Sequence, residues 1–115
     1  MDRKYDLTER TEKFGIAVIN LARRIPKNVI TLPLISQFIR SGTSVGANYC
    51  EADNAESNND FKHKLGISKK EAKETVYWLK MIINICPDLK KEIEEISQEA
   101  NELNLIFNSI IKKCS

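Results

Sequence analysis

The chain has 115 residues, of which 42% are hydrophobic and 30% are charged. This length predicts one domain built around a single apolar core. No apolar run approaches the roughly 20 residues that a membrane-spanning helix needs. Residues 1–4 lead into a polar stretch instead of the apolar core of a signal peptide. We therefore expect a cytoplasmic protein without a membrane partner.

The net charge is only +2, but the charged residues are unevenly distributed along the chain. Residues 1–27 carry seven basic and four acidic groups, and residues 57–86 carry six and three, so each segment has a net charge of +3. Residues 28–56 and residues 87–115 each have a net charge of −2. Such segregation predicts local surface potential even where the total charge is small.

Apolar residues recur at spacings of three and four in four segments, which predicts four amphipathic helices. The first helix is expected at about residues 8–25. Thr8 is its predicted N-cap, and Pro26 ends it. The second helix is expected at about residues 32–54, with Pro33 tolerated in its opening turn.

The second half of the chain continues the same pattern. The third helix is expected at about residues 58–86, with Ser57 as its N-cap, and Pro87-Asp88 should end it and cap the next. The fourth, at about residues 89–113, has the clearest repeat, with apolar residues at alternating spacings of four and three. Short connections between four such helices predict an all-α, antiparallel up-down-up-down four-helix bundle.

Residues 41–48, in the second predicted helix, are poor helix formers, and each interior glycine costs about 1 kcal/mol relative to alanine. We therefore expect another backbone to approach there. One interpretation is a tight helix crossing inside the bundle beside a solvated polar face. Another is a subunit contact, in which small residues let helices approach and polar groups pair. Its residues would be Arg40, Gly42, Ser44, Gly46, Asn48 and Glu51. A phosphate-binding loop is excluded, because the Gly-Lys-Ser/Thr ending and a preceding strand are missing.

The residue types that carry chemistry are sparse. The cysteines at positions 50, 86 and 114 are odd in number and widely spaced, which indicates reduced thiols instead of a disulfide framework or a zinc site. His63 is the one histidine, whereas a bundle di-iron site needs two Glu-x-x-His pairs. We expect no metal, no cofactor and no catalysis; an enzyme would require a metal or cofactor in purified material.

A basic row is the principal candidate binding site. Its residues recur at spacings of seven, four and seven and so share one face of the third predicted helix: Lys62, Lys69, Lys73 and Lys80. Arg23 and Arg24 of the first helix are further candidates. Such a row can neutralise phosphates. Without an aromatic stacking platform, we expect recognition of the shape and backbone of structured RNA. The alternative is a solvated face on a protein-binding scaffold that contacts no nucleic acid.

Residues 40–48, followed by Glu51-Ala52, resemble the central signature of the four-helix-bundle proteins encoded in intervening sequences of bacterial large-subunit ribosomal RNA genes. The similarity covers nearly the whole chain. It also includes Asp6-Leu7, Ser57, Phe61, Lys64-Leu65, residues 70–75 and Trp78-Leu79. Lys70-Glu71 departs from the Gly-Ser of many members, so no role is transferred to those two positions.

The resemblance implies an up-down bundle that assembles as a homopentameric ring. A related branch comprises accessory proteins of diversity-generating retroelements, which are basic pentamers that associate with nucleic acid and a reverse transcriptase. The partners implied for this chain are therefore further copies of itself, structured RNA and a partner protein such as a reverse transcriptase.

Overall fold

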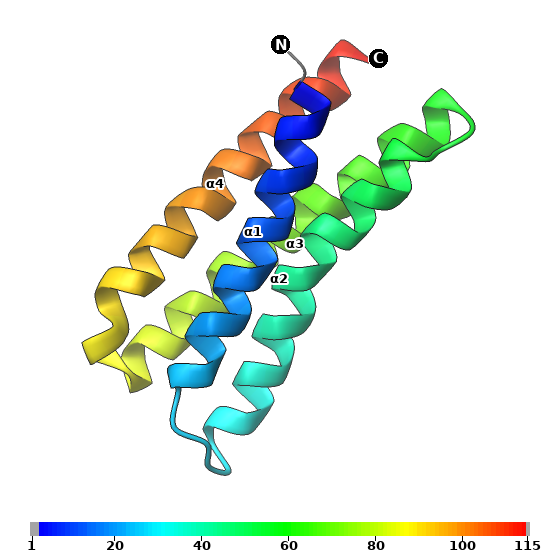
Figure 1. Ribbon diagram of the computed structural model, residues 1–115. Coiled ribbons are helices and arrows are strands. Elements are labelled where there is room, and N and C mark those ends of the chain that lie inside the picture. The colour runs from blue at the N-terminus through cyan, green and yellow to red at the C-terminus, as the bar shows by residue number, and fades with distance from the viewer. Residues whose placement is uncertain (1–2, 115) are drawn as a thin grey trace.

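The computed structural model of the protein describes residues 3–114, with side chains from residue 7 onward. Four antiparallel helices form one bundle (Figure 1). They are α1 (Arg3–Arg24), α2 (Thr31–Asp53), α3 (Asn58–Ile85) and α4 (Lys90–Lys113), with a short 3₁₀ turn, η1 (Pro87–Leu89), before α4. Each helix packs against the next one in the chain, and α4 also packs against α1. No strand occurs within residues 3–114, so the predicted all-α four-helix bundle is confirmed.

The helix boundaries differ from the sequence prediction at two places. The predicted start of the first helix was wrong, because α1 begins at Arg3 and Thr8 lies inside it; residues 3–7 contain no glycine or proline that would break a helix. Asp88 lies in η1, and α4 has no side-chain cap. The Ser57 cap is confirmed, because its side chain accepts a hydrogen bond of 3.0 Å from the Asp60 N–H.

The apolar stripes read from the sequence converge on one core. In α4, the residues at the alternating four and three spacings are buried from Ile93 to Phe107. The core also includes Phe38 of α2 and Leu65 of α3, which are fully buried. Tyr49 stacks on Phe107 with ring centroids 6.2 Å apart and joins α2 to α4.

Buried hydroxyl groups cross the core between α2 and α3. Thr75 Oγ1 donates to Ser41 Oγ at 3.0 Å, and Ser68 Oγ donates to the Val45 carbonyl at 2.9 Å. All three hydroxyl residues are fully buried. Among the described residues, no buried side-chain nitrogen or oxygen lacks a hydrogen-bond partner, so this polar content is tolerated in the core.

The two glycines of α2 lie where α1 crosses it closely. A Cβ atom on Gly42 would come within 2.6 Å of Val18 Cγ2, and one on Gly46 within 3.2 Å of Thr11 Oγ1. Gly42 therefore leaves no room for a side chain without movement of α1. The interpretation of residues 41–48 as a tight crossing inside the bundle is confirmed.

Candidate nucleic-acid interface

The lysine row, defined as Lys62, Lys69, Lys73 and Lys80, lies on α3 along its boundary with α4. Two hydrogen bonds of Lys69 to α4 establish this placement. The Lys69 carbonyl accepts a hydrogen bond of 2.8 Å from Asn104 Nδ2, and Lys69 Nζ donates one of 3.1 Å to Asn108 Oδ1. The other lysines lie within about 40° of Lys69 around the helix, given 100° per residue. Lys62 and Lys80 are 18 positions apart, which corresponds to about 27 Å of straight helix.

The lysine row has no carboxylate partner in the described part of the chain. The α3–α4 seam is closed by amides instead, through Asn104 and Asn108. An amide accepts a hydrogen bond from an ammonium group without cancelling its charge. Lys73 and Lys80 are exposed, whereas Lys62 and Lys69 are half-buried. The row is therefore a line of positive charge that no carboxylate of the described residues pairs with.

The α1–α4 seam, in contrast, is closed by ion pairs. Arg10 binds Glu99 through two hydrogen bonds of 2.7 and 2.9 Å and also reaches Glu102 at 2.7 Å. Arg24 pairs with Glu92, and its guanidinium holds the pKa of that carboxyl below its usual value. The arginines of this seam are thus neutralised within the chain.

Ion pairs also close the α2–α3 seam. Arg40 pairs with Glu71 at 3.1 Å and with Glu74, and Lys64 pairs with Glu51 at 2.6 Å. The Trp78 indole N–H donates a hydrogen bond of 2.9 Å to the Glu74 carboxylate. This hydrogen bond, followed by the one from Arg40, lowers the pKa of the Glu74 carboxyl.

The structure does not bring Arg23 and Arg24 beside the lysine row. Both lie at the C-terminal end of α1, and in the described bundle no Cα atom of α1 lies within 8 Å of a Cα atom of α3. Arg24 forms an ion pair with Glu92, while Arg23 is exposed. A contribution from these arginines would therefore involve a separate patch.

The six residues predicted to form a subunit contact all make contacts within their own chain. Arg40 and Glu51 pair with α3, and Gly42 and Gly46 face α1. The remaining polar side chains form hydrogen bonds with the backbone of α2 itself. Ser44 Oγ donates a hydrogen bond of 2.6 Å to the Arg40 carbonyl, and Asn48 Nδ2 donates one of 2.9 Å to the Ser44 carbonyl. A subunit contact through this stripe stays a prediction.

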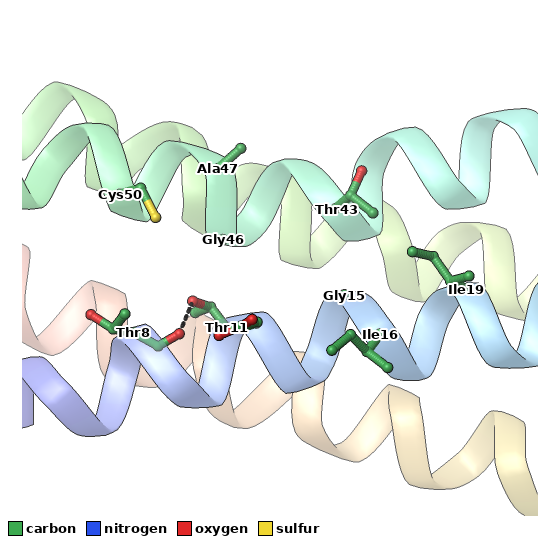
Figure 2. A pocket seen from close by; sticks show the side chains of 10 residues that line it. Thr8, Thr11, Gly15, Ile16, Ile19, Thr43, Gly46, Ala47 and Cys50 are labelled. Carbon is green, nitrogen blue, oxygen red and sulfur yellow. Dashed lines mark hydrogen bonds between the residues drawn. The ribbon is translucent and has the colours of Figure 1, made fainter.

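An apolar groove runs along the outer surface between α1 and α2 (Figure 2), which the sequence reasoning missed. It encloses about 480 Å³, and small residues form much of its lining, including Gly15 and Ala47. Ile16 and Ile19 line it and are exposed, Ile16 to 50%. The sequence could have indicated this exposure, because both isoleucines lie off the apolar face that the spacings of three and four predict for the first helix. Exposed aliphatic residues beside a groove are typical of protein contacts.

Nothing in the described residues indicates catalysis. No three His, Cys, Asp or Glu side chains within residues 3–114 gather closely enough to hold a metal ion. The described cysteines are free, and burial raises the pKa of the Cys86 thiol, which disfavours the reactive thiolate. His63 is exposed. None of the described helices is long and apolar enough to cross a membrane.

These features define a small all-α bundle with a basic seam between α3 and α4. The family model described as "23S rRNA-intervening sequence protein" matches residues 3–109, and the chain belongs to this family. Its fold is similar to that of a protein of unknown function from the S23 ribosomal protein family of Bacteroides thetaiotaomicron VPI-5482. The two chains are 34% identical, with a TM-score of 0.87 over 96% of this chain and 99% of that chain. No curated protein matches the chain significantly.

Proposed function

We propose that this protein is a non-enzymatic homo-oligomer that binds structured RNA through the lysine row of α3. The observation that carries the proposal is the α3–α4 seam, where Lys69 meets Asn104 and Asn108 instead of carboxylates. Four ammonium groups on one rigid helix face can contact successive phosphates without an ordering cost for the backbone.

The same seam supports recognition of shape over sequence. Helical RNA presents its phosphates and 2′-hydroxyl groups in a regular geometry, which proteins contact without reading the bases. Tyr77 is the exposed aromatic residue of α3, but it packs edge-on against Trp78 with ring centroids 5.0 Å apart. Two adjacent rings of this kind do not form a platform for successive bases.

Assembly would strengthen a weak contact. Each added copy presents the lysine row again, and linked contacts gain affinity through effective concentration. The α1–α2 groove supports such assembly, because Ile16 and Ile19 present apolar surface beside small residues. The same groove supports the second candidate function, a protein-binding scaffold that contacts no nucleic acid.

The test is a titration of the protein into an end-labelled RNA hairpin at roughly 50 and 200 mM salt, followed by fluorescence anisotropy. The Lys73→Gln/Lys80→Gln variant removes two exposed charges of the lysine row. Its matched control, Lys13→Gln/Lys91→Gln, removes two exposed charges on α1 and α4. We expect the first pair to reduce the slope of log affinity against log salt by about two, and the control to leave it unchanged.

Light scattering on the same samples measures the subunit number, for which the family resemblance implies five. Equal affinity for the two double variants would contradict binding through the lysine row. An oligomer that binds no RNA at the lower salt would favour the scaffold, and a monomer would contradict the proposed assembly.

A further inference from the structure

Four exposed residues of α1 form one row along its outer surface. They recur at spacings of four, three and four, and at 100° per residue they lie within about 60° of one another. We call them the α1 row: Glu12, Ile16, Ile19 and Arg23. Ile16 is 50% exposed and Ile19 37%, and both charged residues are exposed as well. The spacing is that of the contact positions in a coiled coil, so the α1 row is a helix-pairing surface that the bundle leaves exposed.

The two charges of the α1 row lack partners in their own chain. Neither Glu12 nor Arg23 is in an ion pair within the described residues. No residue of opposite charge stands three or four positions from either one, where a helix would bring the side chains together. Arg10 and Arg24 of the same helix, by contrast, are both paired with α4. Glu12 and Arg23 are therefore available to a partner outside the chain.

The α1–α2 groove lies directly beside the α1 row (Figure 2). Glu12, Ile16 and Ile19 line the groove on its α1 side. A Cβ atom on Gly15 would lie 3.9 Å from Thr43, an ordinary van der Waals contact, so packing against α2 does not require a glycine here. The missing side chain instead leaves the groove open beside the two isoleucines. A facing helix can place its own aliphatic side chains in this space.

The α1 row is complementary to a second copy of itself. The midpoint between Ile16 and Ile19 is also the midpoint between Glu12 and Arg23. A second α1, placed antiparallel with a two-fold axis through this point, has Ile16 opposite Ile19 and Glu12 opposite Arg23. Because the axis repeats each contact, one pairing contains two isoleucine contacts and two ion pairs. A parallel copy would bring like charges together, so the charges select the antiparallel arrangement.

We propose that a second copy of this chain docks on the α1 row and the α1–α2 groove through a two-fold antiparallel contact. This inference rests on the homo-oligomer of the proposed function, for which it names one contact and its symmetry. A two-fold contact joins copies in pairs and cannot by itself close a ring of five. It makes a dimer of single chains or joins two rings, and breaking it halves the mass in either case. The lysine row lies at the opposite, α3–α4 seam and stays open to RNA.

The test exchanges the charges of the α1 row. In a pair of identical copies, Glu12→Arg places arginine opposite arginine, and Arg23→Glu places glutamate opposite glutamate. We expect each single variant to raise the dissociation constant of the pair by about tenfold or more. Glu12→Arg/Arg23→Glu restores opposite charges in the reversed order and should assemble as wild type does. The control is Lys91→Glu, which makes the same charge change as Arg23→Glu at an exposed residue of α4.

An equimolar mixture of the two single variants separates pairing from any effect on folding. Between unlike copies, the introduced arginine meets the introduced glutamate, and the native Glu12 of one copy meets the native Arg23 of the other. Sedimentation velocity should show half the wild-type mass for each single variant, at concentrations where wild type and Lys91→Glu are paired. The full mass should return on mixing. Circular dichroism checks that every variant stays helical.

Two results overturn the two-fold contact and leave the proposed function standing. One is an unchanged wild-type mass in both single variants. The other is a loss of mass that neither mixing nor the double variant restores. A monomeric wild type overturns the two-fold contact and the proposed assembly together, while anisotropy titration with the RNA hairpin tests the lysine row separately. Wild type that pellets with phosphatidylglycerol vesicles, when Ile16→Ser does not and the mass is the same, would assign the α1 row to a lipid surface and also overturn the contact.

Discussion

The flank of α4 that faces α1 and the flank that faces α3 both close the bundle, but with different side chains. Glu92, Glu99 and Glu102 meet arginines of α1. On the opposite flank, Asn104 and Asn108 meet Lys69 of α3. Both arrangements satisfy hydrogen bonds across a helix boundary. The carboxylates also cancel the charge of their partners, whereas the amides leave it available to a partner.

The two flanks of α4 are therefore expected to serve different purposes, one folding stability and the other binding. Ion pairs at the partly exposed α1–α4 seam contribute to folding but present little net charge to a ligand. Lys69, which is held by amides, contributes less to folding and retains its attraction for anions. If this division holds, variants of the two seams should affect different measurements.

The largest expected effect follows from placing a carboxylate in the α3–α4 seam. Asn108→Asp keeps the shape of the side chain and the hydrogen bond to Lys69, but converts it into an ion pair. We expect RNA affinity at low salt to fall by about fivefold to tenfold, or about 1 to 1.4 kcal/mol. Ser109→Asp, an equal charge change at a neighbouring exposed residue, is the control for anisotropy titrations. Equal losses for both would mean that only net charge matters.

A smaller effect, on stability alone, is expected at the α1–α4 seam. Arg10→Met keeps the apolar stem but removes the guanidinium that binds Glu99 and Glu102. The free energy of unfolding in urea should fall by about 1 kcal/mol. The control is Lys13→Met, whose ion pair with Glu9 is highly exposed and weak at 4.0 Å. A loss of RNA affinity in Arg10→Met beyond that of Lys13→Met would contradict the division between the seams.

The smallest effect concerns pH. Arg24 lowers the pKa of Glu92 in the folded state, so this carboxyl adds stability above its unfolded pKa and loses it as the pH falls through the folded pKa. Unfolding in urea between about pH 5 and pH 3 should therefore show a falling stability that Glu92→Gln makes shallower. Glu94→Gln is the control, because Glu94 pairs with Lys90 on the same helix. Identical pH profiles for the two variants would show that the Arg24 pair contributes nothing.

The fold could be predicted because its information is local. Spacings of three and four placed residues such as Phe38, Leu65 and Leu103 in the core, and all three are fully buried. The start of α1 could not be predicted in this way, because Thr8 has the chemistry of a cap but nothing before it stops the helix. A cap residue permits a helix start without requiring one.

The candidate site was only partly predictable. Helical spacing placed the lysine row on one face, but the partner of each charge depends on which helix lies beside it. Asn108 is 39 positions from Lys69, and Glu92 is 68 from Arg24. No local pattern in the sequence distinguishes a lysine that will meet an amide from an arginine that will meet a carboxylate.

The buried hydroxyls between α2 and α3 fix how these helices are aligned along their length. Apolar side chains tolerate a shift of one helical turn, because any aliphatic neighbour is acceptable. Ser41, Ser68 and Thr75 do not, since each hydrogen bond needs its own partner at its own height. A sliding α3 would strand these hydroxyls in a dry core. They therefore fix the height of α3, and of the lysine row that it carries, relative to α2.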